Sequence, residues 1–263
     1  MLSIIVCIKQ VPDTHRASFD PKTGVLDRAS AENITNPDDL HAIEAALALR
    51  DACGGSVTAI SMGPPQASDV LAEAYALGVD RCVLVSGPCF AGSDSLVTSK
   101  ILARAITKLG AFDVVVTGFE AIDGNTAHVG YQLSEFLGIP HVTQVHDIRI
   151  EDGHAIVERL YGHEYQKIRV ALPLLVSAGR NANRVRAPRL ADLKNCTGRE
   201  IAVMGLSDIG GSADEYGAAG SPTMVIGTEL FTHARGREAL PGTLDEKIEG
   251  LIHKLKKHNL LRN

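Results

Sequence analysis

The 263-residue sequence contains no tryptophan and only 4% aromatic residues, so its core must be built from Val, Leu, Ile and Ala. Its five cysteines include no CxxC pair, which argues against a disulfide framework and fits a reducing compartment. No apolar run approaches the ~20 residues that cross a bilayer. The opening MLSIIVCIKQ is interrupted by Lys9 and lacks the basic leader and cleavage site of a signal peptide. We therefore expect a soluble cytoplasmic protein without membrane insertion.

Charge and composition narrow the class of protein further. Lys and Arg number 26 against 31 Asp and Glu, a net charge of -5, whereas a nucleic-acid or anionic-membrane binder needs a basic surface. Apolar residues make up 45% and charged residues 22%, as in globular rather than disordered proteins. The sequence thus predicts a folded protein that binds no nucleic acid.

Several motifs that carry chemistry are also missing. The sequence has no GxGxxG dinucleotide fingerprint, no GxxxxGK[ST] phosphate loop and no GxSxG nucleophile turn. Its ten histidines show no metal-ligand spacing, so we expect no zinc site. Cys7 ends the first expected strand and is interpreted as a small packing residue rather than a nucleophile. We predict no catalytic side chain and no bound metal.

Short apolar runs alternate with helical patterns before Pro140. The expected strands span 3–8, 56–61, 81–85 and 113–117. The expected helices span 38–52, 66–77 and 93–109. The runs are nearly continuous in apolar residues, which is typical of strands buried on both faces of a parallel sheet. This order predicts a doubly wound α/β domain with right-handed crossovers.

After Pro140 the pattern changes to consecutive strands. Residues 146–150 and 154–160 are expected to form a β-hairpin around Glu151-Asp152-Gly153, and two further strands are expected at 165–170 and 172–178. We interpret these strands as antiparallel additions to the same sheet. One α/β domain is therefore expected over residues 1–205, in which 181–195 forms a loop with one short helical turn.

Residues 206–263 have a different composition. Gly210, Gly211, Gly217 and Gly220 fall within eleven residues, which predicts a hinge rather than a packed element. The amphipathic stretch 244–261 predicts a terminal helix with Leu and Ile on one face. Two interpretations of this C-terminal arm remain: it folds back on its own domain, or it docks on a partner subunit.

A small polar string follows the strand at 113–117. Asp123-Gly124-Asn125-Thr126-Ala127 contains a glycine turn and leads into an expected helix. Backbone N–H groups at such a helix start suit a pyrophosphate, and Asn125 and Thr126 add donors. The alternative is that Asp123 or Thr126 only caps the helix.

Arginines cluster between residues 180 and 189. They are Arg180, Arg184, Arg186 and Arg189. The cluster is either a solvated loop or a patch that binds a carboxylate-rich partner.

Five strings of the sequence point together to one family. They are Val6–Asp13 (VCIKQVPD), Asn36–Asp39 (NPDD), Ser61–Ala67 (SMGPPQA), Ala74–Asp80 (AYALGVD) and Ala121–Ala127 (AIDGNTA). In order and spacing, residues 2–232 resemble the beta subunit of electron transfer flavoproteins.

The resemblance implies a heterodimer whose alpha subunit carries a redox-active FAD. The beta subunit's own site holds AMP in ordinary members and a second FAD in members that bifurcate electrons from NADH. The string Asp-Gly-Asn-Thr-Ala at 123–127 resembles the second group. The resemblance therefore predicts FAD in this chain, with AMP as the alternative and NADH as a donor.

The resemblance also assigns nucleotide-binding residues by position. The adenine and ribose are expected against Cys7, Lys9, Asn36 and Met62. The phosphates are expected at Asp123, Gly124, Asn125, Thr126 and Ala127. The turn of Gly63, Pro64, Pro65 and Gln66 is expected to border the flavin and any NADH.

The resemblance extends to partners, with one departure. The family's usual Asn-Glu-Pro-Arg-Tyr before its partner-recognition loop reads Arg-Ala-Pro-Arg-Leu at 186–190. Arg184, Arg186 and Arg189 with Leu193 are predicted to form a surface for an acyl-CoA dehydrogenase or similar acceptor. The C-terminal arm is predicted to pack on the alpha subunit.

The predicted function is that of an electron-transfer subunit, which passes electrons between NADH or a dehydrogenase and an acceptor, including by flavin-based bifurcation. A second hypothesis is a nucleotide-binding regulatory module like the universal stress proteins, but their GxxGx₉G[ST] loop is absent after Thr117. A third is a structural beta subunit with an emptied nucleotide site.

Overall fold

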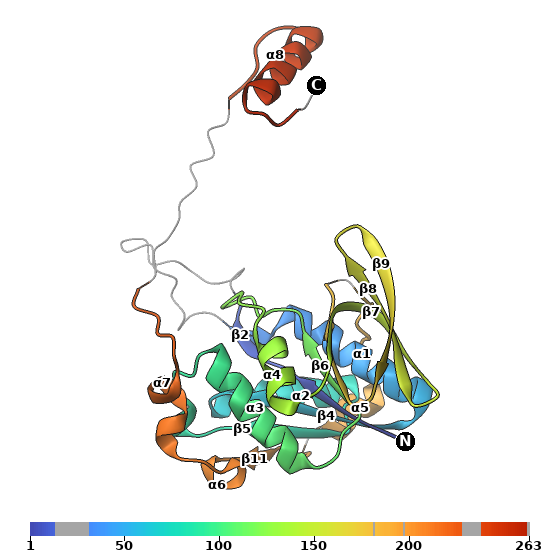
Figure 1. Ribbon diagram of the computed structural model, residues 1–263, viewed down its shortest axis with the longest axis vertical. Helices are drawn as coiled ribbons and strands as arrows, with labels where there is room; N and C mark the ends of the chain where they lie inside the picture. Colours follow the sequence, from blue (N-terminus) through green and yellow to red (C-terminus); the bar gives the residue numbers. More distant parts are fainter. Residues whose placement is uncertain (14–31, 181, 197, 228–237, 262–263) are drawn as a thin grey trace. The chain divides into compact units, whose positions relative to one another are not determined.

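The computed structural model describes residues 1–13, 32–180, 182–196, 198–227 and 238–261. The chain divides into two compact units, residues 1–226 and residues 227–263. The first unit contains the sheet and every residue predicted for a nucleotide site (Figure 1).

A nine-stranded sheet forms the centre of the first unit within the described residues. In sheet order its strands are β11 (Ala202–Met204), β5 (Arg81–Val85), β4 (Gly55–Met62), β1 (Leu2–Cys7), β6 (Val114–Gly118), β10 (Leu174–Ala178), β7 (His141–Glu151), β8 (His154–Tyr161) and β9 (Glu164–Ala171). Strands β11 to β7 pair in parallel, and β7, β8 and β9 pair antiparallel. The predicted doubly wound, mostly parallel sheet with antiparallel additions is confirmed.

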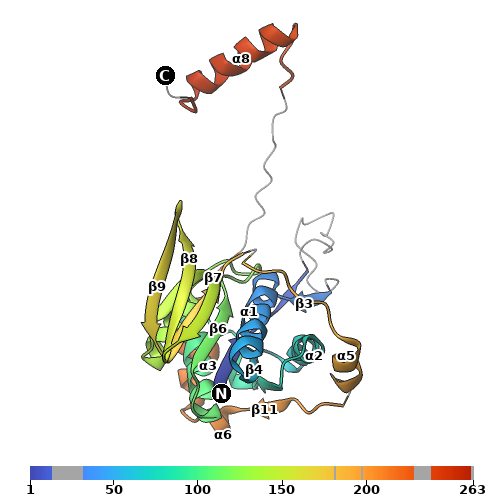
Figure 2. The ribbon, with the colours of Figure 1, turned by 90° about the vertical axis from the view of Figure 1, so that its right-hand side faces the viewer.

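Helices cover both faces of this sheet because successive strand residues point to opposite sides. On one face, Ile4 and Val6 pack with residues of α1 (Pro37–Cys53) and α2 (Ser68–Leu77). On the other face, Ile5 packs with residues of α3 (Ser95–Leu109) and α4 (Val129–Leu137). Figure 2 shows α1 and α2 on the side of the sheet opposite α3. The core is therefore two aliphatic layers divided by β1 and its neighbours.

Strand β10 corrects one expectation from the sequence. It is the last of the consecutive strands after Pro140, yet it pairs in parallel with β6 and β7 rather than antiparallel. All five of its residues, Leu174–Ala178, are buried. A strand buried on both faces belongs in the interior of a parallel sheet, where helices cover each side. The sheet thus continues without a break across Pro140.

The glycine-rich segment after β11 also differs from its prediction as a hinge. Its short elements are α6 (Leu206–Ile209), the 3₁₀ turn η3 (Ala213–Glu215) and α7 (Gly217–Gly220). Two further 3₁₀ turns, η1 (Pro65–Ala67) and η2 (Pro88–Phe90), lie earlier in the chain. Tyr216 is only 1% exposed, and its hydroxyl donates to the Gly210 carbonyl at 2.6 Å.

Glycine is required here for close packing rather than for flexibility. Gly217 has φ +60°, and a Cβ on it would lie 2.5 Å from the Cys89 carbonyl oxygen. Arg104 of α3 donates to the Gly210 carbonyl at 3.1 Å, and Lys100 pairs with Glu215 at 2.7 Å. Residues 206–226 are therefore a packed part of the first unit.

The described residues also include two short strands, the short helix α5 and the terminal helix α8. Strands β2 (Gln10–Pro12) and β3 (Asn33–Thr35) pair antiparallel. Helix α5 (Leu190–Cys196) lies in the arginine-rich segment, where one short helical turn was expected. Helix α8 (Leu244–Lys257) is the expected terminal helix; Thr243 caps it, and none of its residues is buried. Among the described residues, no helix is both long and apolar enough to span a membrane.

The burial of Tyr216 predicts a large loss of stability on its truncation. The variant Tyr216→Ala should lower the free energy of unfolding by about 3–5 kcal/mol, because a buried aromatic ring and its hydrogen bond are lost. Urea unfolding measures this, with Tyr165→Ala as the control, since Tyr165 is 80% exposed. Equal effects of the two substitutions would mean that residues 206–226 do not pack on the first unit.

Candidate functional site

A cleft of about 790 Å³ lies at the carboxyl ends of β1, β4, β5 and β6. Strand β1 has β4 on one side and β6 on the other, so the order of the strands reverses at this point. Ligands of open α/β sheets bind at such switch points, because the connecting loops diverge there and leave a crevice. The topology thus places the candidate site at the cleft.

Most of the predicted nucleotide-binding residues line this cleft. They are Cys7, Lys9, Met62, Gly63, Pro64, Asp123, Gly124, Asn125, Thr126 and Ala127. Asn36 and Gln66 are not among its lining residues. That the lining residues bind a nucleotide stays a prediction.

Asn36 supports the cleft indirectly, through hydrogen bonds to the backbone of the loop after β6. Asn36 is fully buried. Its Nδ2 donates to the Glu120 carbonyl at 2.9 Å, and its Oδ1 accepts from the Ile122 amide at 3.2 Å. Asn36 therefore holds the loop between β6 and α4. Gln66 is exposed, and its carbonyl accepts from the Gln10 side chain at 2.9 Å.

The loop after β6 has the backbone of an anion site. Asn125 and Ala127 have φ +47° and +53°, so two residues of the loop adopt the left-handed region. Alternating left- and right-handed residues direct successive N–H groups into one concavity that attracts anions. Gly124 has no protein atom within 4 Å of the place a Cβ would take, so its side of the loop is open. These features fit the pyrophosphate predicted for residues 123–127.

The alternative role of Asp123 and Thr126 as helix caps is wrong. Helix α4 begins at Val129 after the N-cap residue His128, and no side chain caps it. Asp123 instead accepts two hydrogen bonds from Lys9 Nζ, at 2.6 and 2.8 Å. This ion pair joins the end of β1 to the loop and offsets the carboxylate charge beside the anion site.

Asp39 is the most perturbed acid of the cleft. It lies at the start of α1, is 6% exposed, and accepts from the Lys9 amide at 2.8 Å. Burial raises the pKa of its carboxyl to about 7, while hydrogen bonds from Asn36, Lys9 and Gly118 oppose that rise. Burial also raises the pKa of the Cys7 thiol well above its ordinary value, so Cys7 stays protonated and is a packing residue.

A second wall of the cleft was missed by the sequence analysis. Residues after β5 line it, among them Ser86, Gly87, Phe90, Ser93 and Asp94. The signal was present, because Ser86-Gly87-Pro88 follows the expected strand 81–85 and the carboxyl ends of parallel strands meet at one edge. Asp39 was missed because the sequence does not show that α1 starts against β6.

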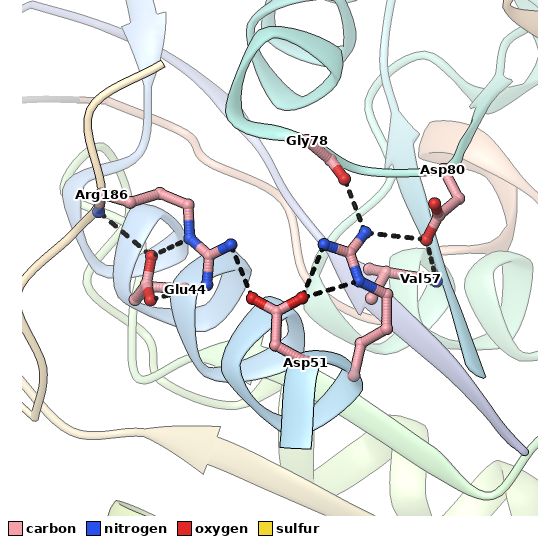
Figure 3. Close-up of polar contacts among 7 residues, drawn as sticks. Glu44, Asp51, Val57, Gly78, Asp80 and Arg186 are labelled. Atoms are coloured by element: carbon pink, nitrogen blue, oxygen red, sulfur yellow. Dashed lines mark hydrogen bonds and ion pairs between the residues drawn. The ribbon is translucent and has the colours of Figure 1, made fainter. Parts of the chain in front are cut away.

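The predicted acceptor surface is only partly exposed. Arg184 and Arg189 are exposed, and Leu193 is 44% exposed. The Arg186 side chain is only 20% exposed, and it pairs with Glu44 at 2.8 Å and Asp51 at 2.9 Å (Figure 3). The structure therefore does not place all four residues on one free surface.

The raised pKa of Asp39 predicts a pH-dependent stability. The folded chain keeps a proton on this carboxyl up to about pH 7, whereas the unfolded chain releases it near the ordinary value of 3.8. The unfolded state thus binds fewer protons between these values, so the contribution of Asp39 to the free energy of unfolding falls as pH rises through that window.

The variant Asp39→Asn should remove this contribution. Relative to the parent chain, the variant should therefore be more stable at pH 8 than at pH 5, as measured by urea unfolding at both values without added nucleotide. A difference between variant and parent that is the same at both pH values would contradict the assignment.

Comparisons with known proteins identify the family. A model of the electron transfer flavoprotein domain matches residues 23–202. The electron transfer flavoprotein subunit beta of Thermoanaerobacterium thermosaccharolyticum is 39% identical over 261 residues, which are 99% of this chain and 100% of the relative. Subunit CarD of the caffeyl-CoA reductase-Etf complex of Acetobacterium woodii is 40% identical over 262 residues, with the same coverage.

A third relative is named as an electron transfer subunit of a reductase. The acryloyl-CoA reductase electron transfer subunit gamma of Anaerotignum propionicum is 38% identical over 267 residues, 99% of this chain and 100% of the relative. The family model spans more than half of the chain, and these relatives align along nearly all of it. The chain therefore belongs to the electron transfer flavoprotein family, among its beta subunits.

Proposed function

We propose that the cleft binds FAD and that the chain, with an alpha subunit, passes electrons between NADH or a dehydrogenase and an acceptor protein. The observation that carries this proposal is the cleft itself. Its volume of about 790 Å³ lies toward the upper end of the ~300–1,000 Å³ of ordinary ligand pockets. A dinucleotide needs such a volume more than AMP does, so FAD is favoured and AMP is the alternative.

The residues present fit such a ligand. The left-handed loop at Asn125 and Ala127 supplies N–H donors for a pyrophosphate, and the Lys9–Asp123 pair offsets the nearest negative charge. Gly63, Pro64 and Pro65 offer a wall with little side-chain bulk against which a flat ring can lie. When bound, FAD supplies the hydride and one-electron chemistry itself.

In this proposal the chain's own residues bind the nucleotide and orient it in the cleft. The loop after β6 fixes the phosphates, and Asn36 holds that loop in place from behind. Gly63, Pro64 and Pro65 would lie along one side of the ring. Burial raises the pKa of the Asp39 carboxyl to about 7, so near neutral pH this group carries less than a full negative charge in the cleft.

Two observations support bifurcation and a CoA-linked acceptor. The 123–127 string resembles that of members that bifurcate electrons from NADH. Two of the relatives are named for complexes with caffeyl-CoA reductase and acryloyl-CoA reductase, which favours an acyl-CoA dehydrogenase or similar acceptor for this chain. Family membership speaks against the regulatory module of universal-stress-protein type.

The nucleotide content of the complex co-purified with the alpha subunit tests the proposal. We expect a visible absorption spectrum and extraction to give two flavins per heterodimer. One flavin with AMP would assign AMP to the cleft, and no nucleotide beyond the alpha-subunit flavin would leave the chain a structural subunit.

Gly124 offers a substitution confined to the cleft. Gly124→Val should lose the cleft nucleotide and keep the alpha-subunit flavin, because its side chain would enter the open space beside the loop without meeting protein. Gly227→Val is the matched control, since that glycine also has no atom within 4 Å and lies outside the cleft. Two flavins retained in Gly124→Val would contradict a phosphate site at this loop.

The C-terminal arm is proposed to pack on the alpha subunit. Leu244, Ile248, Leu251 and Ile252 of α8 are 41–74% exposed, and a soluble chain must cover such a face. Burial of a leucine-sized side chain contributes roughly 1.5–3 kcal/mol, so this face can anchor an interface.

Deletion of residues 228–263 tests that role. It should leave residues 1–226 folded but abolish co-purification with the alpha subunit. The milder variant Ile248→Ser with Leu251→Ser should weaken the same association, because both side chains lie on α8 and leave the first unit unchanged. Native association of the truncated chain would mean that the arm serves its own chain.

A further inference from the structure

We propose that Arg186 is a positioning residue, which fastens residues 182–196 to α1 and so sets where α5 presents its leucines to the acceptor. The inference rests on the proposed function, because it assumes that this segment meets an acceptor protein. It assigns Arg186 a different role from Arg184 and Arg189, with which the sequence groups it.

Three residues on one face of α1 hold the segment. His41, Glu44 and Asp51 are separated by three and seven residues, so they form a single stripe along the helix. At the first point, Asn183 Nδ2 donates to the His41 carbonyl at 2.9 Å, and its Oδ1 lies 2.9 Å from His41 Nδ1. The segment is thus attached to the helix before Arg186 is reached.

Arg186 makes the second and third attachments. Its Nε and Nη2 donate to the two carboxylate oxygens of Glu44 at 2.8 and 3.0 Å, and its backbone amide donates to Glu44 Oε2 at 3.1 Å. Its Nη1 reaches Asp51 Oδ2 at 2.9 Å. The Glu44 and Arg186 side chains are 12% and 20% exposed. A bidentate ion pair that is largely shielded from solvent is stronger than an exposed ion pair and is less screened by salt.

The charge network continues past Asp51 to the turn after α2. Arg50 pairs with Asp51 at 2.9 Å and with Asp80 at 3.0 Å, and it donates to the Gly78 carbonyl at 2.7 Å. Asp80 in turn accepts from the Val57 amide of β4 at 2.8 Å. Figure 3 shows Arg186 in contact with Glu44 on one side and with Asp51 on the other, and the contacts continue from Asp51 to the turn at Gly78 and Asp80. Arg186 is therefore bound directly to α1 and is linked, through Asp51 and Arg50, to the turn after α2 and to β4.

The C-terminal half of the segment, helix α5, carries exposed leucine side chains. On α5, Leu190 is 69% and Leu193 is 44% exposed. Helix α5 packs on α2, the same helix whose C-terminal turn the network reaches. A seven-residue helix is too short to be stable by its own hydrogen bonds, so its position depends on these attachments. Loss of the Arg186 contacts leaves the leucines in place in the sequence but adds the cost of ordering them to each binding event.

The test uses the complex with the alpha subunit, reduced with dithionite. Its oxidation is followed with two acceptors, a purified acyl-CoA dehydrogenase and the small dye dichlorophenolindophenol, which needs no docking surface. The variants are Arg186→Gln and Glu44→Gln. The Glu44 side chain is only 12% exposed and is paired with Arg186. Its substitution should therefore affect acceptor binding only by changing the position of the segment. Arg189→Ala is the control for the amide-exchange measurement only, because Arg189 is an exposed arginine of the same segment that also belongs to the predicted acceptor surface.

We expect both glutamine variants to raise the dehydrogenase concentration for half-maximal rate roughly 5- to 30-fold, the loss typical of a displaced interface anchor. The maximal rate, the dye rate and the flavin content should stay unchanged. Amide hydrogen exchange over residues 182–196 should accelerate in both variants and not in Arg189→Ala.

Leu193→Ala separates this inference from the proposed function. If Leu193→Ala raises the half-maximal concentration and the two glutamine variants do not, the positioning role is wrong and the acceptor surface stands. If none of the three changes it, the acceptor surface itself is wrong. A rise in Arg186→Gln alone, without faster amide exchange, would make Arg186 a direct contact and overturn the inference.

Discussion

The contact between the end of β6 and the start of α1 is the constraint on which the cleft depends. A Cβ on Gly118 would lie 2.3 Å from Asp39 Oδ1 and 2.8 Å from the Asp38 carbonyl carbon, so only glycine permits this approach. The same approach brings Asp39 to the Lys9 amide and thereby joins β1, β6 and α1. The loops that leave this junction form the cleft, and the sheet behind it is packed on both faces.

Several carboxylates lie near this junction, and ion pairs between them and nearby Lys and Arg side chains hold the loops in position. Lys9 pairs with Asp123, while Arg180 bridges Asp38 at 3.2 Å and Glu120 at 2.6 Å. Asp39 accepts hydrogen bonds from amide donors, but burial outweighs them and raises the pKa of its carboxyl to about 7. Further along α1, Arg186 is bound by Glu44. These charged side chains make contacts within the chain that fix the positions of its loops.

Much of the cleft could be predicted from the sequence, because strand-and-helix order determines which loops share the carboxyl edge of a parallel sheet. The lining by Cys7, Lys9, Met62 and the 123–127 loop follows from that rule together with a family resemblance. The role of Asn36 behind the loop and the packed state of the segment around Tyr216 could not be predicted. Both depend on partners more than 80 residues away in the sequence, Glu120 for Asn36 and Arg104 for the Tyr216 segment.

The sequence by itself determined the fold class, since apolar periodicity decides which segments become strands or helices and which faces they bury. It also led to the prediction of an anion site in the loop at 123–127, because the small residues of that loop are visible in the sequence. Only the tertiary structure decided that β10 lies inside the parallel sheet, that Gly217 and Gly220 allow close packing, and that Arg186 pairs with Glu44 of α1. The physical reason is that a strand's neighbour, a glycine's surroundings and an arginine's counter-ion are set by long-range contacts, which local sequence patterns do not contain.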